Sequence, residues 1–399
     1  MCALPAFAST ASAKAGSASR ARFRLLETGG LLRFGFPVHA EFDAPGHGGR
    51  FRLTRGGKPV PAQFRPLDRP GRSDAVALDF TTSVGPLGQE DYEVEFGPSV
   101  EPGPEPKTGL VLEREGSLVR VGKRSGLHWE FPSDLTSWLT RSADGKRIYA
   151  DGSASELRLE TTDGKRAKVG STGRDGLVVD REGPLAIRLV QTSTISVAGG
   201  PEFRSRVVLD FVSSKSWIEV TWEVEDPRGE LRRQEASLRL LLDGKPNLVD
   251  FGASSWVYEQ LKADETTRFV AGPEGRKPRW AIEQSGKDGR RRAFAISVSE
   301  DTREVEGWAH VADATRCTAI AVDDFAAHAE DSLELGGSGE VVISREYPTG
   351  PKRSKTTDAS RRLLRFWIHV VPTPVQVGAL TSPQAILAPP KLVWGSPVG

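Results

Sequence analysis

The sequence predicts an all-β protein, and three observations carry that prediction. Apolar and polar residues alternate along many short segments, which is the pattern of half-buried strands. Asp-Gly pairs suit the positive φ angles of tight hairpin turns, and they occur at Asp144, Asp151, Asp163, Asp175, Asp243 and Asp288. No long segment has convincing helical periodicity. Together these features favour β-sandwiches or barrels over alternating strands and helices.

The clearest strands form a hairpin. One face of the second strand carries Ile218, Val220, Trp222 and Val224, and the other face is polar. The preceding strand has Val207, Leu209 and Phe211, and the segment 213–216 joins the two as a four-residue loop. Further strands are predicted at Glu93–Phe96, Leu118–Val121, Glu156–Glu160, Ala186–Val190, Ser237–Leu242, Ala293–Val298, Ala319–Val322, Glu340–Ser344 and Leu364–Val371.

One short helix is predicted at Asp324–Leu333, with Asp324 as its N-cap. It would have two or three turns, too little to change the fold class.

A proline-rich linker at Pro98–Lys107 divides the chain, because four prolines in ten residues make an extended segment. We predict a small part at 23–97 and a large part at 108–380. Residues 381–399 are predicted to be a Pro-rich tail that wraps over the surface or leads outward. Residues 1–22 are Ala/Ser-rich, and Ala11-Ser12-Ala13 matches a signal-peptidase site. They are read as a signal-peptide remnant or a disordered tail, and the protein is expected to be secreted or periplasmic.

The composition excludes several classes of protein. The 399 residues include 54 Lys and Arg against 53 Asp and Glu, a net charge of +1, which argues against a globally basic nucleic-acid binder. No apolar run approaches the roughly 20 residues that span a bilayer. Two cysteines, Cys2 and Cys317, cannot build a disulfide framework, and Cys317 reads as a buried apolar side chain.

Catalytic and cofactor motifs are absent from the sequence. It has no G-x-S-x-G elbow, no phosphate-binding glycine loop and no H-E-x-x-H helix, so no metal or cofactor is predicted. Two basic clusters, 276–292 and 352–365, are either solvated loops or a surface for a polyanion such as an acidic polysaccharide. Trp280 is the only aromatic residue within them, so the basic runs lack the repeated interleaved aromatics of a stacking surface, which argues against nucleic acid.

The nine tryptophans are candidates for stacking on sugar rings or for core packing. Trp222 shares the apolar face of its strand and is assigned to the core. Trp217 falls on the polar face, so it is either an inter-sheet contact or a binding aromatic.

The order of several short segments resembles the exo-rhamnogalacturonan lyase-like family. These segments are Gly35–Val38, Phe51–Leu53, Lys58–Phe64, Ala75–Phe80, Gly183–Arg188, Arg206–Glu225, Gly307–Val311, Ala319–Phe325 and Ser354–Thr356. The resemblance implies a small N-terminal RIFT-type β-barrel followed by a large antiparallel β-sandwich of the mutarotase-like supersandwich type. The α/α toroid of that family has no counterpart here, and His310 stands where the family tends to have an acid.

The resemblance also implies a chemistry, β-elimination on a uronate. Such a site needs a cation for the carboxylate, a base and an acid. The candidate catalytic residues are His310, Lys355, Tyr347 and His369. The candidate substrate-binding residues are Trp308, Arg353 and Trp217.

Three functions stay open at this stage. The leading one is a carbohydrate-related protein that binds an acidic polysaccharide or oligosaccharide, or supports a lyase partner. The second is a compact polysaccharide lyase acting on rhamnogalacturonan-type glycans. The third is a non-catalytic structural or envelope protein, since a fold does not fix a function. A Trp-lined concave face would favour binding or catalysis, and faces of alternating Glu and Arg would favour the structural role.

Overall fold

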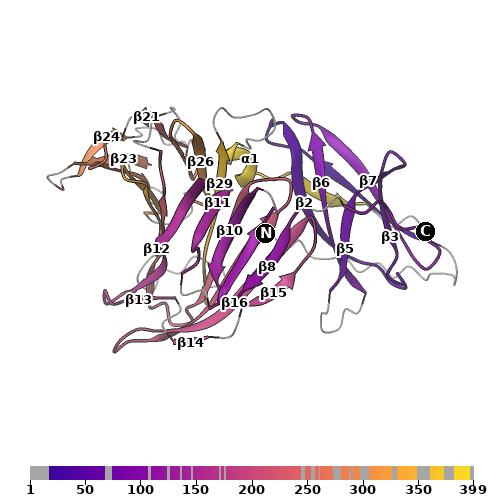
Figure 1. Ribbon diagram of the computed structural model, residues 1–399, viewed down its shortest axis with the longest axis horizontal. Helices are drawn as coiled ribbons and strands as arrows, with labels where there is room; N and C mark the ends of the chain where they lie inside the picture. The colour runs from indigo at the N-terminus through magenta and orange to yellow at the C-terminus, as the bar shows by residue number, and fades with distance from the viewer. Residues whose placement is uncertain are drawn as a thin grey trace.

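The computed structural model confirms the all-β prediction. It describes residues 18–67, 74–106, 109–123, 126–134, 137–144, 147–169, 172–174, 177–243, 248–252, 257–259, 261–272, 280–286, 289, 291–296, 305–325, 330–347, 360–372 and 382–395. These residues form thirty strands and one short helix, α1, arranged as two lobes side by side (Figure 1).

The smaller lobe contains two antiparallel sheets. A five-stranded sheet has the order β30-β1-β7-β3-β4, and a three-stranded sheet has the order β2-β6-β5. Their bounds are β1 Ser19–Leu26, β2 Arg33–Asp43, β3 Phe51–Arg55, β4 Lys58–Val60, β5 Ala62–Pro66, β6 Ala75–Val84, β7 Gln89–Phe96 and β30 Lys391–Trp394. Alternate apolar residues of both sheets form one core, which includes stacked Phe23 and Tyr92 with ring centroids 5.2 Å apart.

The larger lobe has a twelve-stranded sheet with the order β24-β23-β22-β27-β28-β19-β12-β11-β10-β9-β8. The twelfth strand, β13, pairs with β12. Its bounds are β8 Val111–Glu115, β9 Leu118–Gly122, β10 Leu127–Pro132, β11 Arg141–Asp144, β12 Arg147–Thr161, β13 Arg166–Lys168, β19 Leu231–Leu240, β22 Thr266–Ala271, β23 Trp280–Ser285, β24 Arg291–Ile296, β27 Ser332–Gly336 and β28 Glu340–Glu346.

A ten-stranded sheet faces it, with the order β14-β16-β17-β18-β29-β26-β25-β20-β21, and β15 pairs with β16. Its bounds are β14 Thr172–Arg174, β15 Val178–Arg181, β16 Ala186–Ser196, β17 Glu202–Val212, β18 Trp217–Glu225, β20 Leu248–Phe251, β21 Val257–Glu259, β25 Trp308–Ala312, β26 Arg316–Val322 and β29 Arg361–Pro372.

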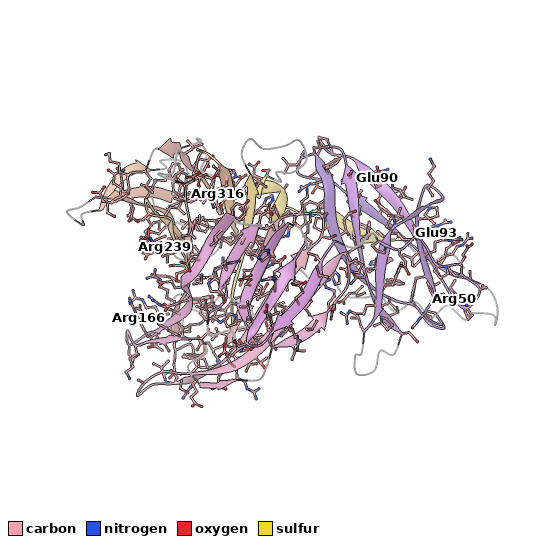
Figure 2. The ribbon with its side chains drawn as sticks, in the orientation of Figure 1. Arg50, Glu90, Glu93, Arg166, Arg239 and Arg316 are labelled. Atoms are coloured by element: carbon pink, nitrogen blue, oxygen red, sulfur yellow. The ribbon has the colours of Figure 1, made fainter. Side chains whose placement is uncertain are left out.

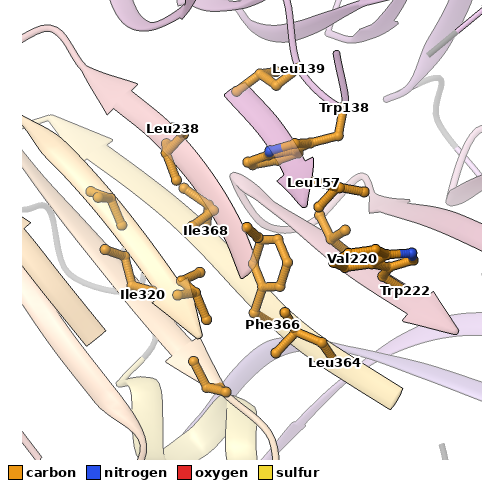
Figure 3. Close-up of a cluster of buried hydrophobic side chains, with 14 of the residues drawn as sticks. Trp138, Leu139, Leu157, Val220, Trp222, Leu238, Ile320, Leu364, Phe366 and Ile368 are labelled. Atoms are coloured by element: carbon orange, nitrogen blue, oxygen red, sulfur yellow. The ribbon is translucent and has the colours of Figure 1, made fainter. Parts of the chain in front are cut away.

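Aromatic side chains join the two large sheets into a sandwich. Trp138 meets Phe366 edge-on with ring centroids 5.4 Å apart, and Phe131 meets Phe211 at 5.5 Å. Figure 3 shows Trp138 and Phe366 together with Trp222 in this core. Burying aromatic and branched side chains from two facing sheets is the main stabilising contribution of such a fold.

The predicted hairpin is confirmed in detail. β17 ends at Val212, β18 begins at Trp217, and residues 213–216 form the loop between them. Trp222 is fully buried, as its place on the apolar face predicts, and its Nε1 donates to Ser205 Oγ at 3.0 Å.

The predicted helix at Asp324–Leu333 is wrong. Asp324 has a φ of +50°, which interrupts a right-handed helix, and Phe325 is buried in the sandwich core. Residues from Ser332 onward form β27, which pairs with β22 and β28. The described ends of this segment are a turn at 323–325 and the strand β27, and residues 326–329 lie outside the described residues.

Residues 382–395 form a short helix and a strand. α1, Pro383–Leu387, lies against β25 and β26 of the sandwich. β30 then pairs with β1 in the small lobe, with Phe23 opposite Trp394. The C-terminal segment therefore contacts both lobes (Figure 1). The predicted domain boundaries remain predictions.

A buried network of charges also joins the lobes. Arg181 of β15 donates to Asp79 of β6 at 2.7 Å and to Asp210 of β17 at 2.6 Å. His39 of β2 contacts Asp79 at 2.8 Å, and Arg188 of β16 donates to Asp210 at 2.7 Å. Burial by itself lowers the pKa of His39, but hydrogen bonds to Asp79 and Glu41 outweigh it, so the pKa is raised.

Candidate functional site

The structure brings three of the predicted site residues into one row on the outer face of the ten-stranded sheet. Trp217 lies opposite His369, His369 opposite Ala319, and Ala319 opposite His310. The next row holds Trp308, Ala321 and Trp367. Outward-pointing residues of adjacent strands become neighbours in a sheet, so long-range pairing alone assembles this group.

The row is covered by other parts of the chain. Trp217 meets Phe36 of β2 edge-on at 5.9 Å, and both belong to a buried cluster with Trp308, Trp367 and Ile386 of α1. His369 is 1% exposed and packs edge-on against Trp217 at 5.6 Å. These tryptophans therefore pack between the lobes and beneath α1. The catalytic and substrate-binding roles assigned to this row remain predictions.

Buried polar contacts hold α1 in place. Arg33 donates to the carbonyl oxygens of Ala385 at 2.5 Å and Ala388 at 2.6 Å, and it pairs with buried Glu27 at 2.8 Å. Burial raises the pKa of Glu27, but hydrogen bonds from the Leu87 N–H, from Arg33 and from two further backbone N–H groups outweigh it and lower the pKa to about 2.

A second attachment links α1 to the candidate row. Gln384 of α1 donates to both carboxylate oxygens of Glu306, at 2.9 and 2.7 Å. Glu306 also accepts from Trp308 Nε1 at 2.7 Å. The Trp308 side chain is thus fixed by the same acid that anchors the helix.

His310 has a carboxylate partner. Its Nδ1 lies 3.0 Å from Oδ1 of Asp250, which lies opposite it on β20. The Trp308 ring is 5.1 Å from the imidazole, centroid to centroid.

Cys317 lies on the neighbouring strand β26. Burial, together with the charges of Asp250 and Asp313, raises the pKa of its thiol to about 11, so this cysteine stays protonated and unreactive at neutral pH.

Tyr347 lies away from this row. Its hydroxyl donates to Gln234 and to the Leu363 carbonyl, and the Arg362 guanidinium sits 4.7 Å from its ring centroid. Burial raises its pKa well above the ordinary value. The structure does not bring Tyr347 together with His310. Lys355 and Arg353 lie outside the described residues.

Charged residues alternate across the outer face of the twelve-stranded sheet. One ladder of opposed residues crosses seven strands, with acidic and basic members in strict alternation: Glu113, Arg120, Glu130, Arg141, Asp151, Arg239 and Glu340. Figure 2 shows Arg239 and Arg166 at the outside of this sheet. Such cross-strand pairs neutralise one another and keep the face hydrated.

A small polar hollow opens where this ladder reaches the sheet edge. It is lined by Val111, Glu113, Arg120, Gly122, Lys123 and His128. Gly122 is required there, because a Cβ would come within 2.4 Å of the His128 Cα. The Arg120 guanidinium is held by Glu130 at 3.0 and 3.1 Å and more loosely by Glu113 at 3.4 Å.

Sequence reasoning missed this hollow. Its residues come from three consecutive strands whose register fixes which side chains meet. The only local signal is the basic turn 122–126, in which two glycines flank Lys123 and Arg124.

The described residues contain neither a candidate metal site nor a candidate membrane-spanning helix. Within these residues, no three His, Cys, Asp or Glu side chains are placed to hold a metal ion. Likewise, no helix in the described part of the chain has the length and apolar character to cross a membrane.

Comparison with solved structures identifies the fold in carbohydrate-active proteins. An α-mannosidase from Enterococcus faecalis V583 superposes with a TM-score of 0.57 over 94% of this chain, at 9% sequence identity. A glycosyl hydrolase family 38 protein from Enterococcus faecalis gives a TM-score of 0.56 at 8% identity, also over 94% of this chain. What is shared is the fold.

The match covers only part of those proteins. This chain spans 46% of the α-mannosidase chain and 47% of the glycosyl hydrolase family 38 chain, about half of their length. No family model matches the sequence, and no curated protein matches it. The resemblance to the lyase-like family therefore stays a hypothesis about sequence.

Proposed function

We propose that this protein is a carbohydrate-binding β-sandwich protein that holds an acidic saccharide in the hollow of β8, β9 and β10 without cleaving it. The main observation in its favour is that the two cations of this hollow, Arg120 and Lys123, lie at the surface. The fold shared with carbohydrate-active chains supports a saccharide as the ligand class.

Arg120 is suited to a carboxylate ligand. Glu130 occupies its Nε and Nη2 atoms, which fixes the plane of the guanidinium. Nη1 has only the 3.4 Å contact with Glu113, whose side chain is half exposed. A uronate carboxylate can replace Glu113 there, since charge-assisted bonds to a preoriented arginine are strong. Lys123 is exposed, and no ion pair joins it to another described residue, so it offers a second positive charge.

The arrangement of the predicted catalytic groups argues against cleavage. β-Elimination requires a base, an acid and a cation around one substrate carbon. His369 is buried against Trp217 of the same sheet, and Tyr347 lies in a separate buried contact with Gln234. Binding a saccharide without cleaving it requires none of these groups and needs only the hollow of β8, β9 and β10.

Affinity electrophoresis with polygalacturonate tests this proposal. We expect retarded migration that survives moderate salt, because direct contacts at short range resist screening. The double variant Arg120→Ala, Lys123→Ala should bind at least tenfold more weakly, because loss of the Arg120 bond alone, at ~1.4 kcal/mol, already gives that factor.

The matched control is Arg239→Ala, which removes a cation from the same ladder but far along it. If this variant and the double variant lose retardation equally, diffuse charge explains binding and the proposal fails. Release of unsaturated products by the wild-type protein would instead support the lyase alternative.

A structural role is the second candidate function. The alternating ladder from Glu113 to Glu340 is the feature predicted for a sheet face with no ligand. The absence of retardation on both acidic and neutral glycans would favour this role.

A further inference from the structure

The three most exposed large apolar side chains of the described residues all lie on the small lobe. Leu87 is 73% exposed, Leu32 69% and Phe34 60%, and none of them packs into a hydrophobic core of the described chain. Leu32 and Phe34 lie at the start of β2, and Leu87 lies in the turn between β6 and β7. Single exposed apolar residues are ordinary on a protein surface, but a group of them marks an interaction site.

One buried carboxylate ties these two segments together. Glu27 Oε2 accepts from the Leu31 N–H at 3.1 Å and from the Leu87 N–H at 3.0 Å, so the two backbone nitrogens are close neighbours. Arg33 is buried and pairs with the other carboxylate oxygen at 2.8 Å. β2 and β6 also pair at this end, with Arg33 opposite Val84. The exposed apolar side chains are therefore presented from a fixed backbone.

Leu87 adopts a backbone conformation that disfavours leucine. Its φ is +54°, in the left-handed region where glycine is the usual residue, and Gly88 follows it directly. A glycine would offer the same N–H to Glu27, so that hydrogen bond does not require a leucine. Neither the turn nor burial accounts for this side chain. A contact with another molecule does, because unfavourable local conformations persist where function needs them.

The surface formed by residues 28–35 and 85–88, here called the apolar surface, exposes no charged side chain. The only charged residue in these two segments is Arg33, which is buried. Segments that enter a bilayer surface typically carry Lys or Arg beside their apolar residues to bind anionic head groups. Charge does not select a foreign protein partner here either. An uncharged apolar surface can face its own copy across a two-fold axis without repulsion, which favours a second copy of this chain as the occupant.

We propose that the apolar surface is the contact of a symmetric dimer, in which Leu32, Phe34 and Leu87 of one copy pack on the same residues of a second copy. Its exposed and partly exposed residues are 28–32, 34–35 and 85–88, which are eleven in all. A standard interface uses about 20–30 residues on each side, so this dimer is weak and reversible. The inference goes beyond the proposed function, because it concerns the small lobe and not the hollow at Arg120.

Sedimentation equilibrium of the full chain from about 2 to 200 μM tests the proposal, because this range covers the weak affinities of small interfaces. We expect the average mass to rise from that of a monomer toward that of a dimer. The rise should persist in about 1 M NaCl, since an uncharged contact is not screened by salt. A chain that stays monomeric throughout, or a dimer that dissociates in high salt, would overturn the inference.

Leu87→Gly separates the contact from the fold. This variant removes the side chain and relieves the left-handed strain, so its melting temperature should stay close to that of the wild type. Its dimer should be at least tenfold weaker, because one buried leucine side chain is lost from each copy. The matched control is Val178→Ala on β15 of the larger lobe, where the valine is 57% exposed. If both variants associate as the wild type does, the apolar surface is not the contact.

Charges placed at Phe34 test the symmetry. Phe34→Glu and Phe34→Lys should each be monomeric, because like charges then meet across the two-fold axis. An equimolar mixture of the two should associate more than either variant alone. A mixture that stays monomeric while Leu87→Gly also leaves the wild-type mass unchanged would refute the symmetric contact.

Other occupants of the apolar surface are outcomes of the same experiments. If the chain dimerises only after residues 1–17 are deleted, that segment covers the surface and the dimer is refuted. If the chain stays monomeric and the wild type, but not Leu87→Gly, sediments with phosphatidylcholine vesicles, the surface binds a membrane instead. All of these measurements are made without saccharide. Their failure therefore leaves the hollow at Arg120 untouched, and loss of polygalacturonate retardation leaves the dimer untouched.

Discussion

Arg181 Nη1 lies 2.7 Å from Asp79 Oδ1, which ties β15 of the sandwich to β6 of the small lobe. Both side chains are buried, and the same guanidinium reaches Asp210 at 2.6 Å. A buried ion pair adds little net stability over an apolar pair, but removing one partner leaves an uncompensated charge. This contact therefore fixes how the lobes meet.

Replacing Arg181 with Met should lower the free energy of unfolding by about 3 kcal/mol, because buried Asp79 loses its permanent cation and keeps only the His39 imidazole as a partner. Urea denaturation measures this loss. The control is Arg166→Met, which breaks an exposed pair with Glu160 and should change stability by less than about 0.5 kcal/mol. Equal effects of the two substitutions would contradict a special role for the junction.

His39 should make the junction depend on pH. Its pKa is raised in the folded state, so its stabilising contribution is complete below the unfolded value of about 6.5 and is lost as the pH rises through the folded value. Stability measured from pH 6 upward should therefore fall more steeply for the wild type than for His39→Gln. Identical pH profiles would show that the imidazole carries no charge in this contact.

Glu27 should act in the opposite direction. Its folded pKa is about 2, so it contributes stability above its ordinary pKa near 4.5, and this contribution is lost as the pH falls toward 2. Glu27→Gln should destabilise the protein at pH 7, and the difference from wild type should shrink in acid. A difference that is the same at pH 7 and pH 2.5 would contradict this.

Ile386→Ala should loosen α1 from the tryptophans beneath it. Removing a buried isoleucine side chain costs about 2–5 kcal/mol when the surroundings cannot close the gap. Exposure of Trp308 and Trp367 should shift tryptophan fluorescence to longer wavelength before global unfolding. Leu387→Ala, at a partly buried position on the same helix, is the matched control and should have a smaller effect.

Alternation of apolar and polar residues along the sequence correctly predicted those features of the fold that depend on residues close together in the chain. The hairpin from Val207 to Val224 follows from alternation alone, and so does the burial of Trp222. The helix prediction at Asp324 failed because the apolar residues at its two ends belong to a turn and to a strand. Nothing local distinguishes this arrangement from a helix.

The sites depend on pairing between distant residues. Asp250 and His310 are 60 positions apart and meet only through the register of β20 and β25. The hollow at Arg120 needs three strands in register, and the junction at Arg181 needs two lobes. Residue types indicated His310 as chemically interesting, but only the fold supplies its partner.

The pairing of β30 with β1 has a consequence for synthesis. Trp394 packs on Phe23 and Phe42, with ring centroids 5.0 and 5.4 Å apart, so residues near 394 complete a core whose first strand is made some 370 residues earlier. On a ribosome, domains generally fold as they emerge, from the N-terminal end. Here the small lobe must wait for the whole sandwich to be translated. Until then β1 lacks its β30 partner, so this edge of the sheet is open to pairing with other chains.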